Sequence, residues 1–171
     1  APNPVVLFDL DYDGVPRKGL AQAGKTGWVY ILDRVTGEPL VGIEERAVPQ
    51  EPRQATAATQ PFPIGDPFVT QTLDIPPEGF DLTNQGKIFT PFWDEPILLK
   101  RGEANWPPST VDPAKGYMYV CAGERQAAYS TQTDTDLASS GDRYTGGSMR
   151  FAPVPTTGVV AAVNLRDNKV V

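Results

Sequence analysis

Short apolar runs alternate with polar turn signals over residues 4–43. The runs PVVLFDL, RKGLAQA, WVYILD and EPLVGI are separated by DYDG, GKTG and RVTG, and each of these gaps contains Gly together with Asp or Thr. This alternation is typical of antiparallel strands that are joined by tight turns. We therefore predict four consecutive strands between Pro4 and Ile43, with no amphipathic helix in that part of the chain.

The end of the chain repeats part of this pattern. Residues 158–171 (GVVAAVNLRDNKVV) match residues 27–40 (GWVYILDRVTGEPL) without a gap, at an offset of 131 residues. In both copies a glycine and five apolar residues precede an Asp or Asn, whose side chain can bond its own backbone. Gly37 and Asn168, which tolerate positive φ, close the turn. A third stretch, residues 105–123, has the same order of strand, turn and strand, so we predict a propeller or another β array.

A proline-rich stretch of about sixty residues, 44–103, separates the first strands from the later ones. It lacks periodicity, but it is a poor match to a simple linker because it contains aromatic residues that need burial. These are Phe62, Phe68, Phe80, Phe89, Phe92 and Trp93. We predict ordered insertion loops over a propeller face, with one or two strands, and segment 71–89 is also compatible with one short helix.

Composition and charge narrow the class of protein. The chain has 171 residues, of which 40% are hydrophobic and 21% charged, and it contains 18 Pro and 16 Gly. These values indicate one globular, loop-rich β domain. The net charge is −6 and the basic residues are scattered, which excludes a nucleic acid or an anionic membrane as an expected partner. No apolar run approaches the ~18 residues of a membrane span, and the first residues lack the basic region of a signal peptide.

The Cys and His content removes several kinds of active site. Cys121 is the single cysteine, and its apolar strand GYMYVCAG predicts a buried structural thiol. The chain has no histidine. Catalytic triads that use His, His-based zinc sites and His general bases are therefore not expected.

The hexapeptide DLDYDG resembles the start of an EF-hand calcium loop, with Asp9, Asp11 and Asp13 at alternate positions. The acid that should close such a loop at its twelfth position is replaced by Leu20. Pro16 and the apolar strands on both sides favour a hairpin turn instead. We therefore predict no metal site here.

Three longer segments carry a family resemblance. GKTGWVYILDRVTGEPLVGIEERAVPQ, GEANWPPSTVDPAKGYMYV and GVVAAVNLRDNKVV resemble the quinoprotein dehydrogenases that use pyrroloquinoline quinone (PQQ), the family of methanol, ethanol and membrane glucose dehydrogenases. The resemblance runs from near Val5 to the last residue. It implies an eight-bladed β-propeller of antiparallel four-stranded meanders, of which this chain holds about three blades.

The same resemblance implies how the chain is organised. Residues 1–171 form a single partial propeller domain, with a first blade-like meander in 1–43, the proline-rich insertion in 44–103 and further blade strands in 104–171. Family blades tend to end in a docking motif like A-x-[DN]-x-x-T-G-x-x-x-W. A Trp would follow close behind Val171, which therefore looks like the cut edge of a fragment. The first copy has Val41 near the expected Trp, so its blade must dock in another way.

The resemblance carries cofactor contacts to three positions. Lys25 matches the family cation that reaches the quinone oxygens, Asn105 matches an asparagine that contacts PQQ, and Trp106 lies in the same segment. Each has a structural alternative: Lys25 as a solvated turn lysine, Asn105 as a loop cap, and Trp106 as a core residue. If the cofactor reading holds, Lys25 and Asn105 face the propeller axis on the same side.

Other family residues lie outside this chain. The catalytic Asp base is expected upstream of Ala1, as are the Ca²⁺ ligands and an adjacent-cysteine disulfide of the parent protein. A Trp that helps enclose the cofactor is expected beyond Val171. No catalytic residue and no metal ligand is therefore assigned within residues 1–171.

The expected function is that of a piece of a PQQ-dependent dehydrogenase. The parent protein would oxidise an alcohol or a sugar in the periplasm or another extracytoplasmic space and pass electrons to a cytochrome or a membrane quinone. The isolated chain would be inactive without the rest of the propeller and would self-associate through its strand edges. The alternative is a non-catalytic propeller-repeat module that acts as a binding or scaffold surface.

Overall fold

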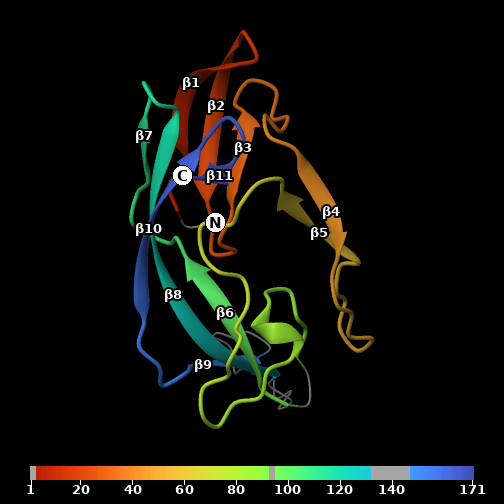
Figure 1. Ribbon diagram of the computed structural model, residues 1–171. Helices are drawn as coiled ribbons and strands as arrows, with labels where there is room; N and C mark the ends of the chain where they lie inside the picture. Colours follow the sequence, from red (N-terminus) through yellow and green to blue (C-terminus); the bar gives the residue numbers. More distant parts are fainter. Residues whose placement is uncertain (1–2, 93–94, 132–146) are drawn as a thin grey trace, which may run out of the picture.

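Eleven strands and one short 3-10 turn make up the computed structural model, which describes residues 3–92, 95–131 and 147–171 (Figure 1). The strands are β1 (Val6–Tyr12), β2 (Val15–Ala23), β3 (Val29–Asp33), β4 (Ile43–Ala47), β5 (Thr59–Pro63), β6 (Ile97–Glu103), β7 (Thr110–Asp112), β8 (Tyr117–Thr131), β9 (Gly147–Phe151), β10 (Thr157–Asn164) and β11 (Lys169–Val170). The 3-10 turn, η1 (Asn84–Gly86), lies inside the segment that was compatible with a short helix. The all-β prediction is confirmed.

β1, β2 and β3 form an antiparallel meander in the order of the sequence. The turn between β1 and β2 consists of Asp13 and Gly14, whose φ angles of 53° and 82° are both positive, as a type I′ hairpin requires. Asp11 Oδ1 accepts a hydrogen bond of 2.6 Å from the Gly14 N–H, and Asp9 pairs with Arg34 at 2.8 Å. The DLDYDG segment is thus the hairpin turn that its Pro and flanking strands predict.

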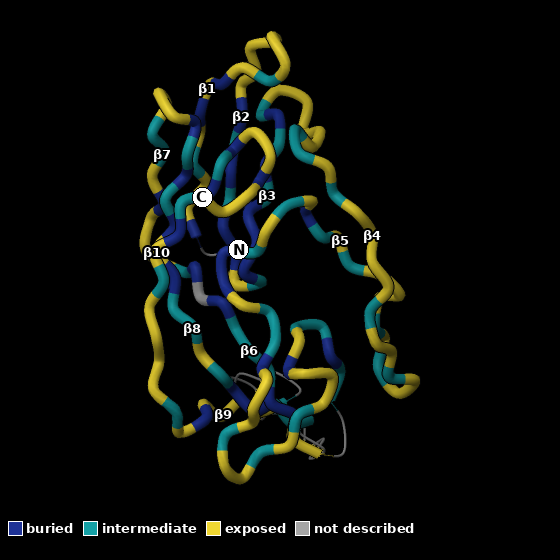
Figure 2. Tube along the Cα trace, viewed as in Figure 1, coloured by how far each residue is buried: buried dark blue, intermediate teal, exposed yellow. Residues whose placement is uncertain are grey.

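The fourth strand that we predicted up to Ile43 does not form in this sheet. Only an isolated bridge between Leu32 and Pro39 extends it. Hydrogen bonds from the Asp33 N–H to the Glu38 carbonyl at 2.8 Å and from the Leu40 N–H to the Ile31 carbonyl at 3.0 Å flank this bridge, and the chain then turns away from β3. β4 begins at Ile43 and pairs with β5 instead, so the two strands form an arm that extends from the body of the molecule and is largely exposed (Figures 1 and 2).

The second sheet is built on β8, the longest strand. β10 and then β9 pair along one edge of β8, while β7 and then β6 pair along the other, and β11 extends the sheet beyond β10. All of these pairs are antiparallel. β8 therefore connects a lower part of the sheet, with β6 and β9, to an upper part that packs against the first sheet (Figure 1).

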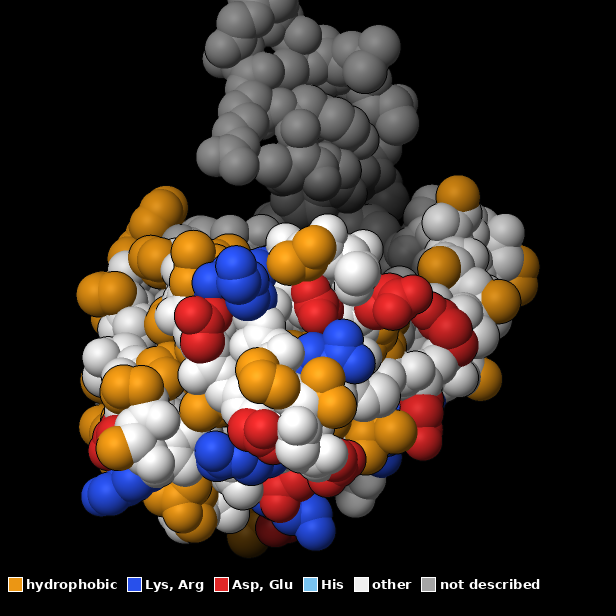
Figure 3. Space-filling view, turned by 90° about the horizontal axis from the view of Figure 1, so that it is seen from above, with side chains coloured by type: hydrophobic (Ala, Val, Ile, Leu, Met, Phe, Trp, Pro, Cys, Tyr) orange, Lys and Arg blue, Asp and Glu red, His pale blue; other side chains and the backbone are white. Residues whose placement is uncertain are grey.

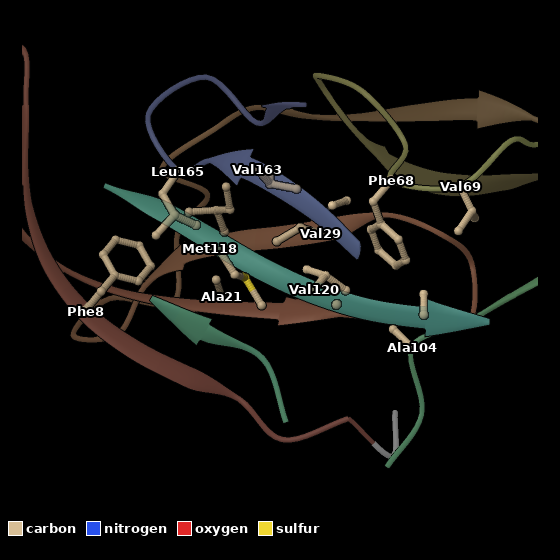
Figure 4. Packing of buried hydrophobic residues seen from close by; sticks show 14 of the residues in the cluster. Phe8, Ala21, Val29, Phe68, Val69, Ala104, Met118, Val120, Val163 and Leu165 are labelled. Atoms are coloured by element: carbon tan, nitrogen blue, oxygen red, sulfur yellow. The ribbon is translucent and has the colours of Figure 1, made fainter. Parts of the chain in front are cut away.

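The main core lies between the two sheets (Figure 4). Met118 and Val120 of β8 pack with Val163 of β10 against Val29 of β3, and each of these side chains is at most 1% exposed. Full burial of a side chain of this size contributes about 1.5–3 kcal/mol. The contact between the sheets is therefore a principal source of stability for this part of the molecule.

The proline-rich stretch is ordered and takes part in packing. Phe68, which is 4% exposed, and Val69 complete the core between the sheets, as Figure 4 shows. Phe62, Phe80, Phe89 and Phe92 are partly buried, and Trp93 lies outside the described residues. The stretch contributes to three strands, β4, β5 and β6, and not to the one or two that we predicted. That its loops cover a propeller face stays a prediction.

The internal repeat is visible in the backbone. Asp33 Oδ1 accepts a hydrogen bond from the N–H two residues later at 2.8 Å, and Asn164 Oδ1 does the same at 3.1 Å. Gly37 and Asn168 close the two turns with φ angles of 80° and 57°, and residues 112–116 form a third turn of the same kind. The predicted repeat is thus a structural repeat with the same turn geometry.

The prediction that Cys121 is buried was wrong. Alternation along β8 points Met118 and Val120 into the core, and Cys121 lies on the opposite, exposed face. It pairs across the sheet with Val160, which is 76% exposed. The strand is apolar on both faces, so its composition could not indicate which face is covered.

Charged groups of both signs are intermixed on the face seen in Figure 3, with exposed hydrophobic side chains between them. This view agrees with the scattered basic residues of the sequence. In the described part of the chain, no helix has the length and apolar character needed to cross a membrane.

Candidate cofactor site

Lys25 lies in the tight turn that joins β2 to β3. The Gly24 N–H donates to the Trp28 carbonyl and the Gly27 N–H to the Gly24 carbonyl, each at 3.1 Å, and Gly27 has a φ of 83° that favours glycine. The Lys25 side chain is exposed. Among the described residues it has no hydrogen-bond or ion-pair partner, so its ammonium group is available to a ligand.

Asn105 follows the end of β6. Ala104 before it is fully buried, Asn105 itself is partly buried, and Trp106 after it is 74% exposed. Trp106 is thus not part of the core that the described residues form. The segment is held at Pro107, whose carbonyl accepts a hydrogen bond of 2.8 Å from Asn3 Nδ2.

Asn3 also ties this segment to the first sheet. Its own carbonyl accepts a hydrogen bond of 2.9 Å from Nε2 of Gln22, next to the last residue of β2. Asn3 is only 2% exposed. Sequence reasoning did not identify Asn3 or Gln22, because a single Asn before a strand has no pattern that distinguishes it from a loop residue.

The turn that carries Lys25 and the strand end that leads to Asn105 lie against each other. A Cβ atom placed on Gly102 of β6 would be 3.2 Å from Gly27 Cα and 2.5 Å from Val69 Cγ2, so a side chain at this position would crowd the close approach of the two backbones. The structure thus brings the two predicted cofactor segments together, although they are about eighty residues apart in the sequence. That their side chains share one ligand stays a prediction.

Unpaired polar atoms lie in the Asn105 segment and beside it. Within the described part of the chain, the buried atoms Asn3 Oδ1, Asn105 Oδ1 and Ser109 Oγ lack a hydrogen-bond partner. Buried polar groups are normally paired, so several unpaired ones in one region indicate a place for a ligand or water. The two amide oxygens need a hydrogen-bond donor, such as water or a ligand N–H, whereas the Lys25 ammonium can donate to a carbonyl or carboxylate oxygen.

Metal ligands do not gather among the described residues, where no group of three Asp, Glu or Cys side chains is close enough to hold an ion. The Ca²⁺ of the parent protein, expected from the resemblance, stays a prediction.

The described residues form paired antiparallel sheets of the β-propeller class. The model of the PQQ-dependent glucose/ethanol/alcohol dehydrogenase β-propeller domain matches residues 1–164, and the chain belongs to this family.

Individual relatives agree with this assignment. The chain is 31% identical over 130 residues to the quinohemoprotein alcohol dehydrogenase ADH-IIG of Pseudomonas putida, a match that covers 75% of this chain. Its fold resembles the quinohemoprotein alcohol dehydrogenase of Comamonas testosteroni, with a TM-score of 0.58, 18% identity and 98% of this chain covered. The corresponding values for the solved structure of ADHIIG from Pseudomonas putida HK5 are 0.52, 20% and 98%.

The chain spans only a small part of these proteins. It covers 16% of the length of the curated relative and 23% and 24% of the two solved chains.

Proposed function

We propose that this chain forms part of the cofactor site of a PQQ-dependent dehydrogenase that oxidises an alcohol or a sugar. The observation that carries the proposal is the contact between Gly27 and Gly102, which places the Lys25 turn beside the segment of Asn105. Membership of the quinoprotein family and the unpaired Asn105 Oδ1 support it.

The residues of this chain would bind and polarise the cofactor. PQQ, when bound, supplies a quinone that accepts the electrons removed from the substrate carbon. The ammonium of Lys25 would hold positive charge where negative charge develops on a quinone oxygen. The Asn105 amide would fix the orientation of the ring by donating to one oxygen and accepting a hydrogen bond in return.

The remaining functions belong to the whole protein. In this proposal the rest of the propeller supplies the catalytic Asp and the Ca²⁺ ligands and covers the exposed face that carries Cys121 and Val160. A cytochrome or a membrane quinone takes the electrons in an extracytoplasmic compartment, and the isolated chain has no dehydrogenase activity.

Substitutions in the intact protein test the proposal. Lys25→Gln removes the charge at similar size, and we expect kcat with an alcohol substrate to fall about 100-fold. Asn105→Ala removes the amide, and we expect about tenfold weaker PQQ binding, measured by cofactor titration of the apoprotein. Lys115→Gln is the matched control, because Lys115 is likewise an exposed lysine in a short turn between two strands, β7 and β8.

The proposal is overturned if Lys25→Gln and Asn105→Ala retain the kcat and PQQ affinity of the Lys115→Gln control. In that case the non-catalytic propeller-repeat module would be the better description.

A further inference from the structure

A hollow of about 420 Å³ lies between the β4–β5 arm and the loop that contains η1. Its volume is within the range of about 300–1,000 Å³ that is typical of small-molecule sites. Lys25, Asn105 and Trp106 do not line it. Trp28, whose carbonyl closes the Lys25 turn, does line it, so the hollow lies beside the candidate cofactor site and contains none of the three residues assigned to the cofactor.

Aromatic rings form one wall of the hollow. Trp28 and Phe62 meet edge to face, with ring centroids 6.2 Å apart and an interplanar angle of 88°. Phe62 also meets Phe89 in the same manner, at 5.7 Å. Val48 and Ile88 add aliphatic surface. This wall can accept a flat or branched apolar group.

The charged groups of the lining are all cationic. Arg46 places its guanidinium carbon 5.1 Å from the centre of the Phe62 ring and 6.0 Å from that of Trp28. Lys87, which directly follows η1, also lines the hollow. The lining contains no Asp or Glu, although the whole chain has a net charge of −6.

The two cations differ in how far they are already neutralised. Arg46 donates to Glu44 Oε2 through Nε at 3.2 Å and through Nη2 at 3.1 Å, so a carboxylate outside the lining compensates part of its charge. Lys87 has no ion pair among the described residues. Its ammonium is thus the stronger attraction for an anion, and Arg46 keeps the aromatic wall in place by stacking on it.

We propose that this hollow binds a small organic carboxylate with an apolar body. The body packs against Trp28 and Phe62, and the carboxylate lies towards Lys87 and Arg46. An ammonium–carboxylate contact at a half-enclosed apolar surface is stronger than in open water because the local dielectric constant is lower.

Calorimetric titration of the intact, PQQ-loaded protein with benzoate tests this proposal, with benzamide as the neutral ligand of the same shape. We expect benzoate to bind at least tenfold more tightly than benzamide and to lose affinity as salt is added. Lys87→Gln should weaken benzoate binding about tenfold, a change of about 1.4 kcal/mol, and should leave benzamide binding unchanged.

Arg53→Gln is the control for Arg46→Gln. Arg53 lies in the same arm and pairs with Glu51 two residues earlier, as Arg46 pairs with Glu44, but it does not line the hollow. Arg46→Gln should weaken benzoate binding and Arg53→Gln should not.

Three results would overturn the proposal: no benzoate binding at millimolar concentration, equal affinity for benzoate and benzamide, or an equal effect of Arg46→Gln and Arg53→Gln. Benzoate binding by the apoprotein but not by the PQQ-loaded protein would show that the hollow is part of the cofactor site, which would also overturn the proposal. These outcomes are independent of those for Lys25 and Asn105.

Discussion

Asn168 is a fully buried polar residue that ties the two sheets together at the repeat turn. Its Nδ2 donates to the Val29 carbonyl of β3 at 3.0 Å and to the Ile64 carbonyl at 3.1 Å. Its φ of 57° is in the left-handed region, which Asn and Gly adopt more readily than other residues. We therefore expect this side chain to stabilise the contact between the sheets.

Asn168→Gly keeps the backbone conformation and removes both hydrogen bonds. The Val29 carbonyl is then left without this donor in a buried position, at a cost of about 1–3 kcal/mol. The Ile64 carbonyl loses its bond in a partly buried position, at a cost of about 0.5–1.5 kcal/mol. We expect the free energy of unfolding to fall by about 2–4 kcal/mol. Asn168→Ala should lose about 1 kcal/mol more, because Ala is strained at positive φ.

The repeat supplies the control. Gly37 occupies the matching position 131 residues earlier, with a φ of 80°, and a Cβ atom placed on it would meet nothing within 4 Å. Gly37→Asn should change the free energy of unfolding by less than about 0.5 kcal/mol. Urea denaturation followed by tryptophan fluorescence gives both values. If Asn168→Gly is as harmless as Gly37→Asn, the sheets do not depend on this side chain.

Two other predictions concern stability. Gly65 has a φ of 125°, and a Cβ atom placed there would lie 2.2 Å from the Asn168 carbonyl oxygen. Gly65→Ala should therefore lower the free energy of unfolding by about 3 kcal/mol or more. Gly14 also has a positive φ but open space around it, so Gly14→Ala should lower it by only about 1 kcal/mol in the same urea assay. Glu124 is partly buried, which raises its pKa, but Lys100 at 3.5 Å and hydrogen bonds from Thr70 outweigh this effect and lower the pKa below its usual 4.5. A lowered pKa in the folded state means that Glu124 stabilises the protein above pH 4.5 and that this contribution disappears as the pH falls further. Glu124→Gln should therefore lose about 1 kcal/mol at pH 7 and less at pH 3.5, and a difference that grows with acidity would contradict the assignment.

The first hairpin and the two repeat turns were predictable because each depends on local chemistry. The Asp13–Gly14 pair has the residue types of a two-residue hairpin, and Gly37 and Asn168 occupy the positive-φ positions that the repeat indicates. The pattern did not show that pairing with β3 stops after Leu40, because the partner of the following strand, β5, lies beyond a loop without periodicity.

The face that a strand buries was harder to predict. Met118, Val120 and Cys121 are all apolar in type, so alternation separates them into two faces without indicating which one meets the other sheet. The hollow beside the arm could not be predicted either. Arg46 and Lys87 come from different parts of the proline-rich stretch, and only the tertiary fold brings them to one lining.

The central claim is that Lys25 and Asn105 serve one cofactor. A crystal structure of the intact protein with PQQ bound tests it most directly. The account predicts Lys25 Nζ and the Asn105 amide within about 3.5 Å of oxygen or nitrogen atoms of the same PQQ molecule, on one face of the propeller. A structure in which the two side chains lie on opposite faces, or in which PQQ binds without either of them, would contradict it.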